Sequence, residues 1–261
     1  MAPIVEARGL NKQFGAVVAA KDISIAIDEG TITGLIGTNG AGKTTFVNML
    51  TGYLKPDSGR ITFRGDDITP LPPRAITRLG IARSFQIPQL FNSLTVRENL
   101  VLALAARGAK GLDQLRGVDF AALDAQASDI MERFTLIDFR ESAAGTLPEG
   151  IRKLLDMAVA TVASPVVLLL DEPTSGVASE EKFSVMDRVM AATRGAGVTM
   201  LFVEHDMEIV RRYASRVIAF FAGTVLADGV PDVVLKDARV RELIIGDSQA
   251  PSSAKTGGLD A

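Results

Sequence analysis

The residues Gly37-Thr38-Asn39-Gly40-Ala41-Gly42-Lys43-Thr44-Thr45 satisfy the pattern G-x-x-x-x-G-K-[ST] without a gap. The preceding residues 32–36 are mostly apolar and predict a buried strand, and residues 44–50 predict a helix that leaves the loop. Small residues let the backbone N–H groups of such a loop surround a polyphosphate, and the helix start adds the positive end of its dipole. A chance match in a glycine-rich turn would lack this strand and helix. The segment therefore predicts a nucleoside-triphosphate site.

Two residues of this loop have expected roles of their own. Lys43 is expected to reach the β- and γ-phosphates, and the hydroxyl of Thr44 is expected to bind Mg²⁺. The other loop positions are expected to contact the nucleotide chiefly through their backbone; they are Gly37, Thr38, Asn39, Gly40, Ala41, Gly42 and Thr45.

The composition is ordinary for an α/β protein. The chain has 261 residues, of which 47% are hydrophobic and 23% charged, enough for a sizeable core. A net charge of −3 provides no electrostatic attraction for nucleic acid, so no nucleic-acid partner is expected. The apolar stretches, such as residues 166–170, are too short to span a bilayer, and no signal peptide is visible. Without cysteine, disulfides and thiolate metal sites are excluded, which fits a cytoplasmic location.

The first third of the chain is predicted to be rich in strands. Segments 4–8, 23–27 and 60–63 have strand character, and residues 57–59 and 64–67 are interpreted as turns. From about residue 95 to residue 131 the apolar spacing becomes helical. The second part of the chain therefore differs in kind from the first.

A strand–helix series follows the helical stretch. After a break at 143–148, residues 150–163 predict a helix and the apolar run 166–170 a central parallel strand. The series continues with predicted elements at 180–193, 198–203, 207–213 and 216–220. Residues 247–261 lack periodicity and are expected to form a disordered tail. The expected class is thus α/β.

Charged and polar residues follow two of the predicted strands. Asp171 and Glu172 stand at the end of the run 166–170, where ligands bind in open α/β sheets. Asp171 is expected to hold Mg²⁺ through its water shell, and Glu172 to polarise a water aimed at the γ-phosphate. His205, the single histidine, follows strand 198–203. A lone histidine is usually structural, but this position favours a functional role.

Together these motifs resemble the ATP-binding subunits of ABC transporters, over about residues 4–246. The resemblance implies a P-loop NTPase core with an N-terminal antiparallel β subdomain and a helical subdomain at about residues 87–160. It implies that Phe14 stacks on adenine, the alternative being a core aromatic at a strand edge. It further implies that Gln86 senses Mg²⁺ and the γ-phosphate, and that His205 contacts the γ-phosphate and orients the attacking water. ATP and Mg²⁺ are the implied cofactors.

Finer details are similar to one branch, the ATPase subunits of branched-chain amino-acid importers. They are the segments 51–59, 81–86, 94–100 and 203–207. Relatives in that branch handle urea, short-chain amides or aromatic acids, and the ATPase subunit does not touch the solute. The resemblance implies permease subunits as partners and, indirectly, a substrate-binding protein. It places the chain on the cytoplasmic face of the inner membrane, with residues 87–94 against a helix of the permease.

One motif departs from the family pattern. Such subunits form face-to-face dimers in which ATP lies between one loop and the partner's L-S-G-G-Q signature, and here that segment reads Leu147-Pro148-Glu149-Gly150-Ile151. Pro148 removes a hydroxyl and a backbone N–H, and Glu149 places a carboxylate where a γ-phosphate should bind. Ala178 likewise replaces the usual Asp or Asn.

We therefore expect a heterodimer with a second ATPase subunit. This chain would supply a complete catalytic site and lend a poor signature to its partner's site. The alternative is that Pro148 and Glu149 are a tolerated variant with a normal backbone cradle. Two other functions stay open: an ATP-binding regulatory subunit with low turnover, and a soluble ABC ATPase acting on DNA or ribosomes. A P-loop kinase is not favoured, because no acceptor-binding lid is recognisable.

Overall fold

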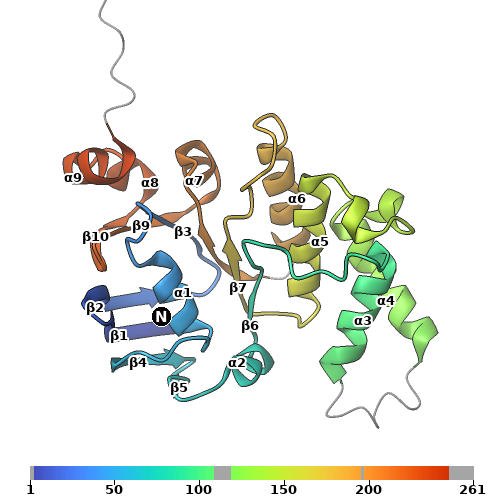
Figure 1. Cartoon of the computed structure of the whole chain (residues 1–261), viewed down its shortest axis with the longest axis horizontal. Helices are drawn as coiled ribbons and strands as arrows, with labels where there is room; N and C mark the ends of the chain where they lie inside the picture. Colours follow the sequence, from blue (N-terminus) through green and yellow to red (C-terminus); the bar gives the residue numbers. More distant parts are fainter. Residues whose placement is uncertain (1–2, 109–118, 195–196, 247–261) are drawn as a thin grey trace, which may run out of the picture.

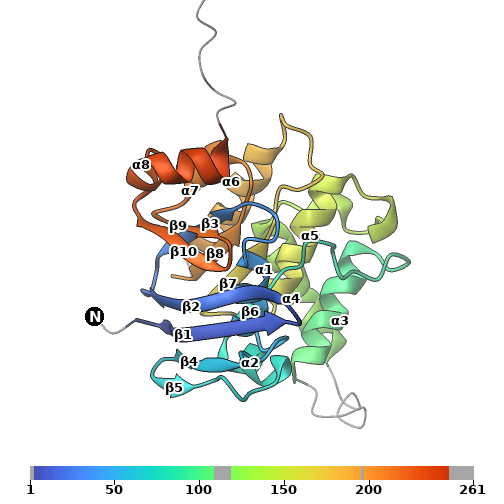
Figure 2. The same ribbon diagram turned by 60° about the vertical axis from the view of Figure 1, so that its left-hand side comes forward.

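The structure is a computed structural model that describes residues 3–108, 119–194 and 197–246. Two sheets organise it, an antiparallel sheet of order β2-β1-β4-β5 and a larger, mostly parallel sheet of order β10-β9-β3-β8-β7-β6. Figure 1 shows the antiparallel sheet at the N-terminal end of the colour scale, and Figure 2 shows it lying alongside the larger sheet. This arrangement agrees with the predicted α/β core and antiparallel β subdomain.

Ten strands and nine α-helices are assigned in the described ranges, and α3, α4 and α5 all lie between β6 and β7. The strands are β1 (Val5–Phe14), β2 (Val17–Ile27), β3 (Ile32–Gly37), β4 (Ser58–Phe63), β5 (Asp66–Asp67), β6 (Ile81–Arg83), β7 (Val167–Asp171), β8 (Thr199–Val203), β9 (Arg216–Phe221) and β10 (Thr224–Gly229). The α-helices are α1 (Lys43–Leu50), α2 (Pro73–Leu79), α3 (Val96–Gly108), α4 (Phe120–Arg133), α5 (Glu149–Thr161), α6 (Lys182–Arg194), α7 (Met207–Tyr213), α8 (Pro231–Val234) and α9 (Ala238–Val240). Short helical turns are η2 (Ile137–Phe139), η3 (Ala144–Thr146) and η4 (Arg241–Ile245).

The parallel strands bring the functional loops to one edge. Strand β3 pairs in parallel with β8 and β9, and β7 lies in parallel between β8 and β6. Every residue of β7 and β8 is buried, as expected for central strands without alternation. Because the carboxyl ends of parallel strands meet at one edge, the loops after β3, β7 and β8 converge there.

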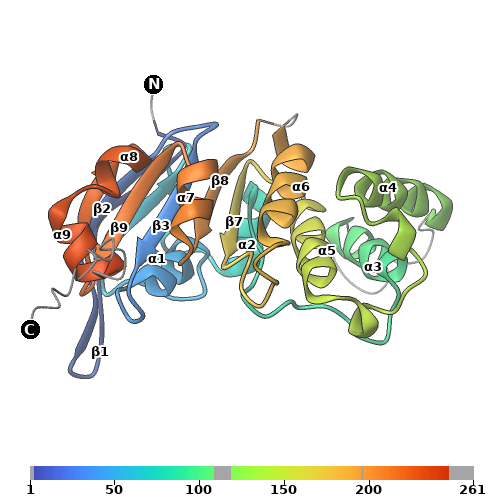
Figure 3. The same ribbon diagram turned by 90° about the horizontal axis from the view of Figure 1, so that it is seen from above.

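Helices α3 and α4 lie at one end of the molecule, and the C-terminal helices α8 and α9 lie at the other (Figures 1 and 3). The predicted helical stretch at 95–131 corresponds to α3 and α4, and residues 109–118 lie outside the described part. The boundaries of the helical subdomain remain a prediction, and the predicted tail, residues 247–261, also lies outside it. None of the helices in the described ranges combines the length and apolarity that a membrane crossing requires.

The turn predicted at residues 57–59 is wrong in part, because Ser58 and Gly59 begin strand β4. Ser58 pairs with Asn11 of β1, and a register shift separates this pair from the one formed by Arg8. At Gly59, with φ 95°, a Cβ atom would lie 2.4 Å from the carbonyl oxygen of Gly9. Glycine is thus required here by a close strand-to-strand approach, which in sequence resembles a turn signal.

Candidate functional site: a nucleotide centre at the sheet edge

The loop of residues 37–45 connects β3 to α1, as its pattern predicts. Gly42 precedes the helix with φ 104°, and a Cβ atom there would lie 2.6 Å from the carbonyl oxygen of Ala19 on β2. At Gly37 a Cβ atom would lie 2.4 Å from the carbonyl oxygen of Phe220 on β9. Both glycines are therefore needed to fit the loop between two strands, whereas residues 38–40 remain exposed at its tip. The exposed backbone of this tip is accessible to a polyphosphate.

The Lys43 ammonium lies inside this loop. Its Nζ atom donates to the carbonyl oxygens of Gly37 and Thr38, at 2.6 and 3.0 Å, and the residue is buried. Burial lowers the pKa of Lys43, and the nearby charges of Glu172 and Asp171 oppose that shift. The side chain therefore lies where phosphate oxygens could replace the two carbonyl oxygens.

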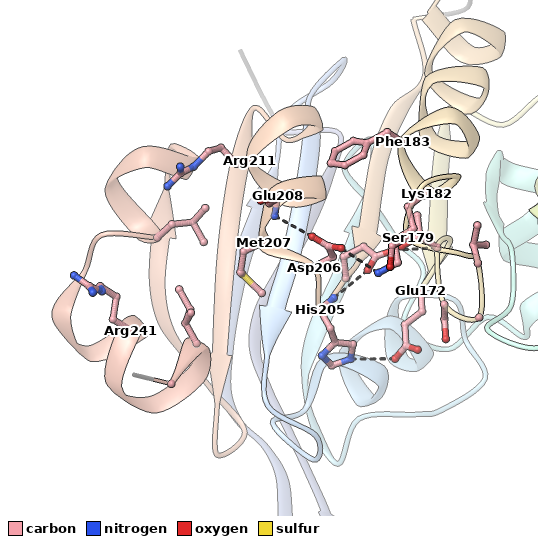
Figure 4. A pocket seen from close by; sticks show the side chains of 18 of the residues that line it. Glu172, Ser179, Lys182, Phe183, His205, Asp206, Met207, Glu208, Arg211 and Arg241 are labelled. Carbon is pink, nitrogen blue, oxygen red and sulfur yellow. Dashed lines mark hydrogen bonds and ion pairs between the residues drawn. The ribbon is translucent and has the colours of Figure 1, made fainter. Parts of the chain in front are cut away.

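Glu172 joins three segments of the chain. Its Oε2 accepts a hydrogen bond from Nε2 of Gln86 at 2.7 Å, and its Oε1 lies 3.1 Å from Nε2 of His205. Figure 4 shows the carboxylate of Glu172 and the ring of His205 pointing toward one another. The structure thus brings together the three residues predicted to be catalytic.

Local geometry explains where this carboxylate lies. Glu172 has φ 50°, and its N–H donates to the carbonyl oxygen of Val203 at 3.0 Å. A left-handed conformation is uncommon for a residue with a long side chain and is maintained only where surrounding contacts enforce it. The strained turn directs Glu172 away from strand β7 and toward His205.

The Glu172–His205 pair lines a cavity of about 1090 Å³. Its opposite wall comes from α7 and the C-terminal turns, which contribute Arg211 and Arg241 (Figure 4). The side chain of His205 is 44% exposed and that of Glu172 is 19% exposed. A water molecule and a phosphate group can therefore reach the pair from solvent.

The oxygen donors near the loop fit Mg²⁺ rather than a transition metal. Thr44 is exposed at the start of α1, Asp171 ends β7, and Gln86 uses its amide nitrogen for Glu172. The described ranges contain no group of three or more His, Cys, Asp or Glu residues that could hold a metal ion. Mg²⁺ commonly uses one carboxylate and takes its other ligands from water and nucleotide phosphates. One carboxylate with a hydroxyl and an amide oxygen matches this preference.

Phe14 ends strand β1, and 51% of its surface is exposed. Exposure of this size excludes the alternative that Phe14 is a core aromatic. Nζ of Lys12 lies 5.6 Å from its ring centroid, and the neighbouring Val17 and Val18 are also exposed. The ring remains predicted, by position and exposure, as the adenine-stacking residue.

Comparison with known proteins agrees with this geometry. The family model described as ABC transporter matches residues 20–175. The chain belongs to the ABC transporter family. It is 35% identical over 246 residues to a probable branched-chain amino acid transport ATP-binding protein, LivG, of Archaeoglobus fulgidus, covering 93% of this chain and 95% of that protein. It is 32% identical over 252 residues to the high-affinity branched-chain amino acid transport ATP-binding protein BraF of Pseudomonas aeruginosa, covering 94% and 99%.

Solved structures of ATP-binding cassettes have the same fold. The ADP conformation of MJ1267, an ATP-binding cassette of an ABC transporter, superposes with a TM-score of 0.83 at 32% identity. That comparison covers 95% of this chain and 100% of the other. The chain is therefore an ATP-binding cassette of the ABC ATPase type, and the role of the centre around Glu172 remains a prediction.

The segment predicted to be a degenerate signature lies at the start of helix α5. Pro148 occupies the N-cap position without a side-chain cap, and Glu149 is exposed in the first helical turn. A Cβ atom built on Gly176 would lie 3.5 Å from Cγ of Glu149, so this side chain lies against the loop that follows Glu172. Leu147 and Gly150 are buried. The signature carboxylate is therefore on the surface, next to the segment that contains Ala178.

Several residues of the centre were missed at the level of sequence. Lys153 of α5 is buried, and its Nζ donates to the carbonyl oxygens of Gln86, at 2.5 Å, and Glu172, at 3.3 Å. Asp156 accepts hydrogen bonds from the backbone N–H groups of Phe85 and Gln89. Both charges lie on the buried side of an amphipathic helix, which is the signal that could have identified them.

Two further buried charges were also missed. Glu204 accepts hydrogen bonds from the N–H and hydroxyl of Thr174 and so connects the loops after β7 and β8. Arg83 ends β6 and pairs with Asp171. Glu204 directly precedes His205, and Arg83 lies three positions before Gln86. No sequence pattern indicates that their partners are Thr174 and Asp171.

Proposed function

We propose that this cassette is the ATP-hydrolysing subunit of an importer for branched-chain amino acids, or for related small amides or organic acids. The observation that carries the proposal is the Glu172 carboxylate, hydrogen-bonded to Gln86 and adjacent to His205, at the edge formed by the nucleotide loop. The solute class is taken from the relatives named above. The cassette acts on the cytoplasmic face of the membrane and powers permease subunits that a substrate-binding protein serves from the other side.

Hydrolysis follows from the positions of the charged groups. Lys43 exchanges its two carbonyl partners for β- and γ-phosphate oxygens of ATP. Glu172 accepts a proton from the water that attacks the γ-phosphorus, while the bond to the bridging oxygen breaks and releases ADP and phosphate. His205 orients that water and the γ-phosphate. Thr44, Asp171 and Gln86 would hold Mg²⁺, which neutralises phosphate charge when it is bound.

Two cassettes facing each other complete each site. ATP binding favours the closed dimer and loss of phosphate favours the open one, which is a two-state switch biased by its ligand. Because Glu149 and Pro148 weaken the signature of this chain, the partner is a second, different ATPase subunit. Glu149 would then face the γ-phosphate bound to that partner, and like charges repel.

The contact with the permease is expected beside Gln86. Ile87 is 73% exposed and Phe91 is 59% exposed, whereas Leu90 packs partly against the core. Two exposed apolar side chains on the segment that follows Gln86 suit the apolar face of a permease helix. A movement of the permease would displace this segment and so change the hydrogen bond between Gln86 and Glu172. This hydrogen bond would then link transport to hydrolysis.

A low-turnover regulatory subunit is the second candidate, and the Glu149 carboxylate is the observation that favours it. A transport assay tests the importer proposal, and the same assay with Glu172→Gln in this chain alone separates the two candidates, because hydrolysis falls only if this chain is catalytic. The cassette would be reconstituted in proteoliposomes with candidate permease subunits, a second ATPase subunit and a substrate-binding protein. We expect leucine, isoleucine or valine to stimulate hydrolysis. Stimulation by amides or aromatic acids alone would change the solute class, and no stimulation by any solute would contradict the importer proposal.

A further inference from the structure

Arg83 lies buried between three elements of the nucleotide centre. Its side chain is 8% exposed, and its Nη2 atom donates to Oδ2 of Asp171 at 2.5 Å. Its Nη1 atom donates to Oδ1 of Asn48 at 2.6 Å. The Asp171 side chain is itself only 7% exposed, so this is a charge pair largely removed from water. A single guanidinium, at the end of β6, thus connects the end of β7 to helix α1.

These two contacts reach the elements that carry the metal-binding candidates. Asn48 is four residues after Thr44 on α1, so the two side chains lie on the same helix face, one turn apart. Asp171 is the candidate carboxylate ligand. From Arg83 the chain runs through Ser84 and Phe85 to Gln86, and the Arg83 guanidinium lies 5.1 Å from the Phe85 ring centroid.

The hydrogen bonding of Arg83 is incomplete. Its Nε atom is buried and has no hydrogen-bond partner within the described part of the chain. Buried polar atoms are rarely left unpaired, and each exception calls for an explanation. Burial of an incompletely paired guanidinium is costly, whereas its two terminal nitrogens bind Asn48 and Asp171, and these two bonds point to a role in placing those side chains.

We propose that Arg83 is a positioning residue for the Mg²⁺ site: by binding Oδ2 of Asp171, it fixes the orientation of the carboxylate that would hold Mg²⁺. The inference rests on the proposed function. The fork of an arginine can address Asp171 and Asn48 from two fixed nitrogens, whereas a lysine presents a single one. Arg83 does not contact the phosphate loop through any hydrogen bond in the described ranges, so binding of nucleotide without metal does not depend on it.

Arg83 could also act on metal affinity in the opposite direction, by charge repulsion, and the direction of the change distinguishes the two effects. A cation next to Asp171 also repels Mg²⁺, so removal of Arg83 would tighten metal binding if repulsion were the larger effect. Residues that orient metal ligands typically change metal affinity by about 10- to 100-fold when they are mutated. Positioning therefore predicts a loss of affinity and repulsion predicts a gain.

The experiment uses the full chain with Arg83→Gln and Arg83→Lys. Binding of Mn²⁺, as a spectroscopic substitute for Mg²⁺, would be measured by electron paramagnetic resonance in the presence of saturating ADP. Binding of ADP would be measured separately in EDTA. We expect the Mn²⁺ dissociation constant to rise by about 10- to 100-fold for Arg83→Gln, with ADP affinity in EDTA unchanged. Asn48→Ala removes one contact of Arg83 without leaving a buried charge unpaired, and should give a smaller loss even if Arg83→Gln does not fold.

Arg216 provides the matched control. It pairs through two nitrogens with Asp228, between β9 and β10, away from the nucleotide loop. Arg216→Gln should leave the Mn²⁺ affinity unchanged. Unchanged or tighter Mn²⁺ binding in Arg83→Lys and Asn48→Ala would overturn the inference, whereas a wild-type chain that binds neither ADP nor Mn²⁺ would instead overturn the proposed function.

Discussion

Nε2 of Gln86 and Oε2 of Glu172 lie 2.7 Å apart although 86 positions separate the residues in the sequence. Gln86 precedes the exposed apolar residues Ile87 and Phe91, and Glu172 directly follows the metal-binding candidate Asp171 at the end of β7. The hydrogen bond therefore joins the proposed permease contact to the carboxylate that is proposed to activate water. A displacement of Gln86 would therefore change the position of the Glu172 carboxylate.

Replacement of Gln86 by alanine removes this hydrogen bond. We expect Gln86→Ala to lower the rate of ATP hydrolysis by about 10-fold or more while ATP still binds, because positioning affects the reaction more than ground-state binding. Hydrolysis and ATP binding would be measured on the assembled complex. Gln89→Ala is the matched control, since Gln89 is exposed three positions later and, among the described residues, its side chain donates to the carbonyl oxygen of Ile87 and not to Glu172. Equal rates for the two variants would contradict the role of Gln86.

Lys153 fixes the backbone of both partners of that hydrogen bond. Lys153→Met leaves the carbonyl oxygens of Gln86 and Glu172 without this donor, at a cost of about 1–3 kcal/mol in the free energy of unfolding. We expect hydrolysis to fall more than ATP affinity, and Lys153→Arg to recover part of it. Urea denaturation and hydrolysis rates would be compared. A loss of stability with an unchanged hydrolysis rate would limit Lys153 to a structural role.

The asymmetry of the dimer can be tested at the signature. In a mixed dimer, Glu172→Gln in this chain inactivates the catalytic site that this chain supplies. The remaining hydrolysis then comes from the site of the partner subunit, which uses the signature of this chain. Restoration of the motif by Pro148→Ser and Glu149→Gly should raise that hydrolysis by about 10-fold or more, because one preorganised donor at a transferring phosphoryl group is commonly worth this much. The two single variants separate the missing hydroxyl from the added charge. No gain in any of them would mean that the motif is a tolerated variant.

Acid should weaken one ion pair of the helical region. Hydrogen bonds from Arg97, which contributes most, and from Arg140 hold the pKa of Asp124 below its ordinary value. A carboxyl group whose pKa is lower in the folded state stabilises the fold at any pH above its ordinary pKa, which is near 4. This stabilisation is lost as the pH falls toward the pKa of the folded state. Asp124→Asn should therefore lower the urea midpoint at pH 7 and differ less from wild type at pH 3. Asp129→Asn, an exposed position on the same helix, is the control, and a difference that grows with acid would contradict the argument.

The fold could be predicted from the sequence because its signals are local. The nucleotide loop carries its strand and helix beside it, and the uninterrupted apolar run before Asp171 identifies a central strand. The C-terminal helices α8 and α9 were not predicted, because helices of three or four residues contain no full apolar period.

The site residues could be predicted from the sequence only where they belong to a recognisable motif. Glu172, His205 and Gln86 stand at recognisable positions, but their mutual contacts depend on strand order, which the sequence does not state. Lys153 and Arg83 act through partners far away in the chain, so no local pattern reveals them. Their interpretation required the direction of each side chain.

Hydrolysis by the mixed dimer with and without Glu172→Gln tests the central claim most directly. This chain would be assayed alone and together with the second ATPase subunit, with ATP binding measured in parallel and Glu180→Gln, at an exposed position nearby, as the control. We expect ATP hydrolysis only in the mixture of the two subunits. Glu172→Gln in this chain should lower the hydrolysis rate of that mixture by about 10²- to 10⁴-fold while ATP still binds. A Glu172→Gln mixture that hydrolyses ATP at the wild-type rate would contradict it.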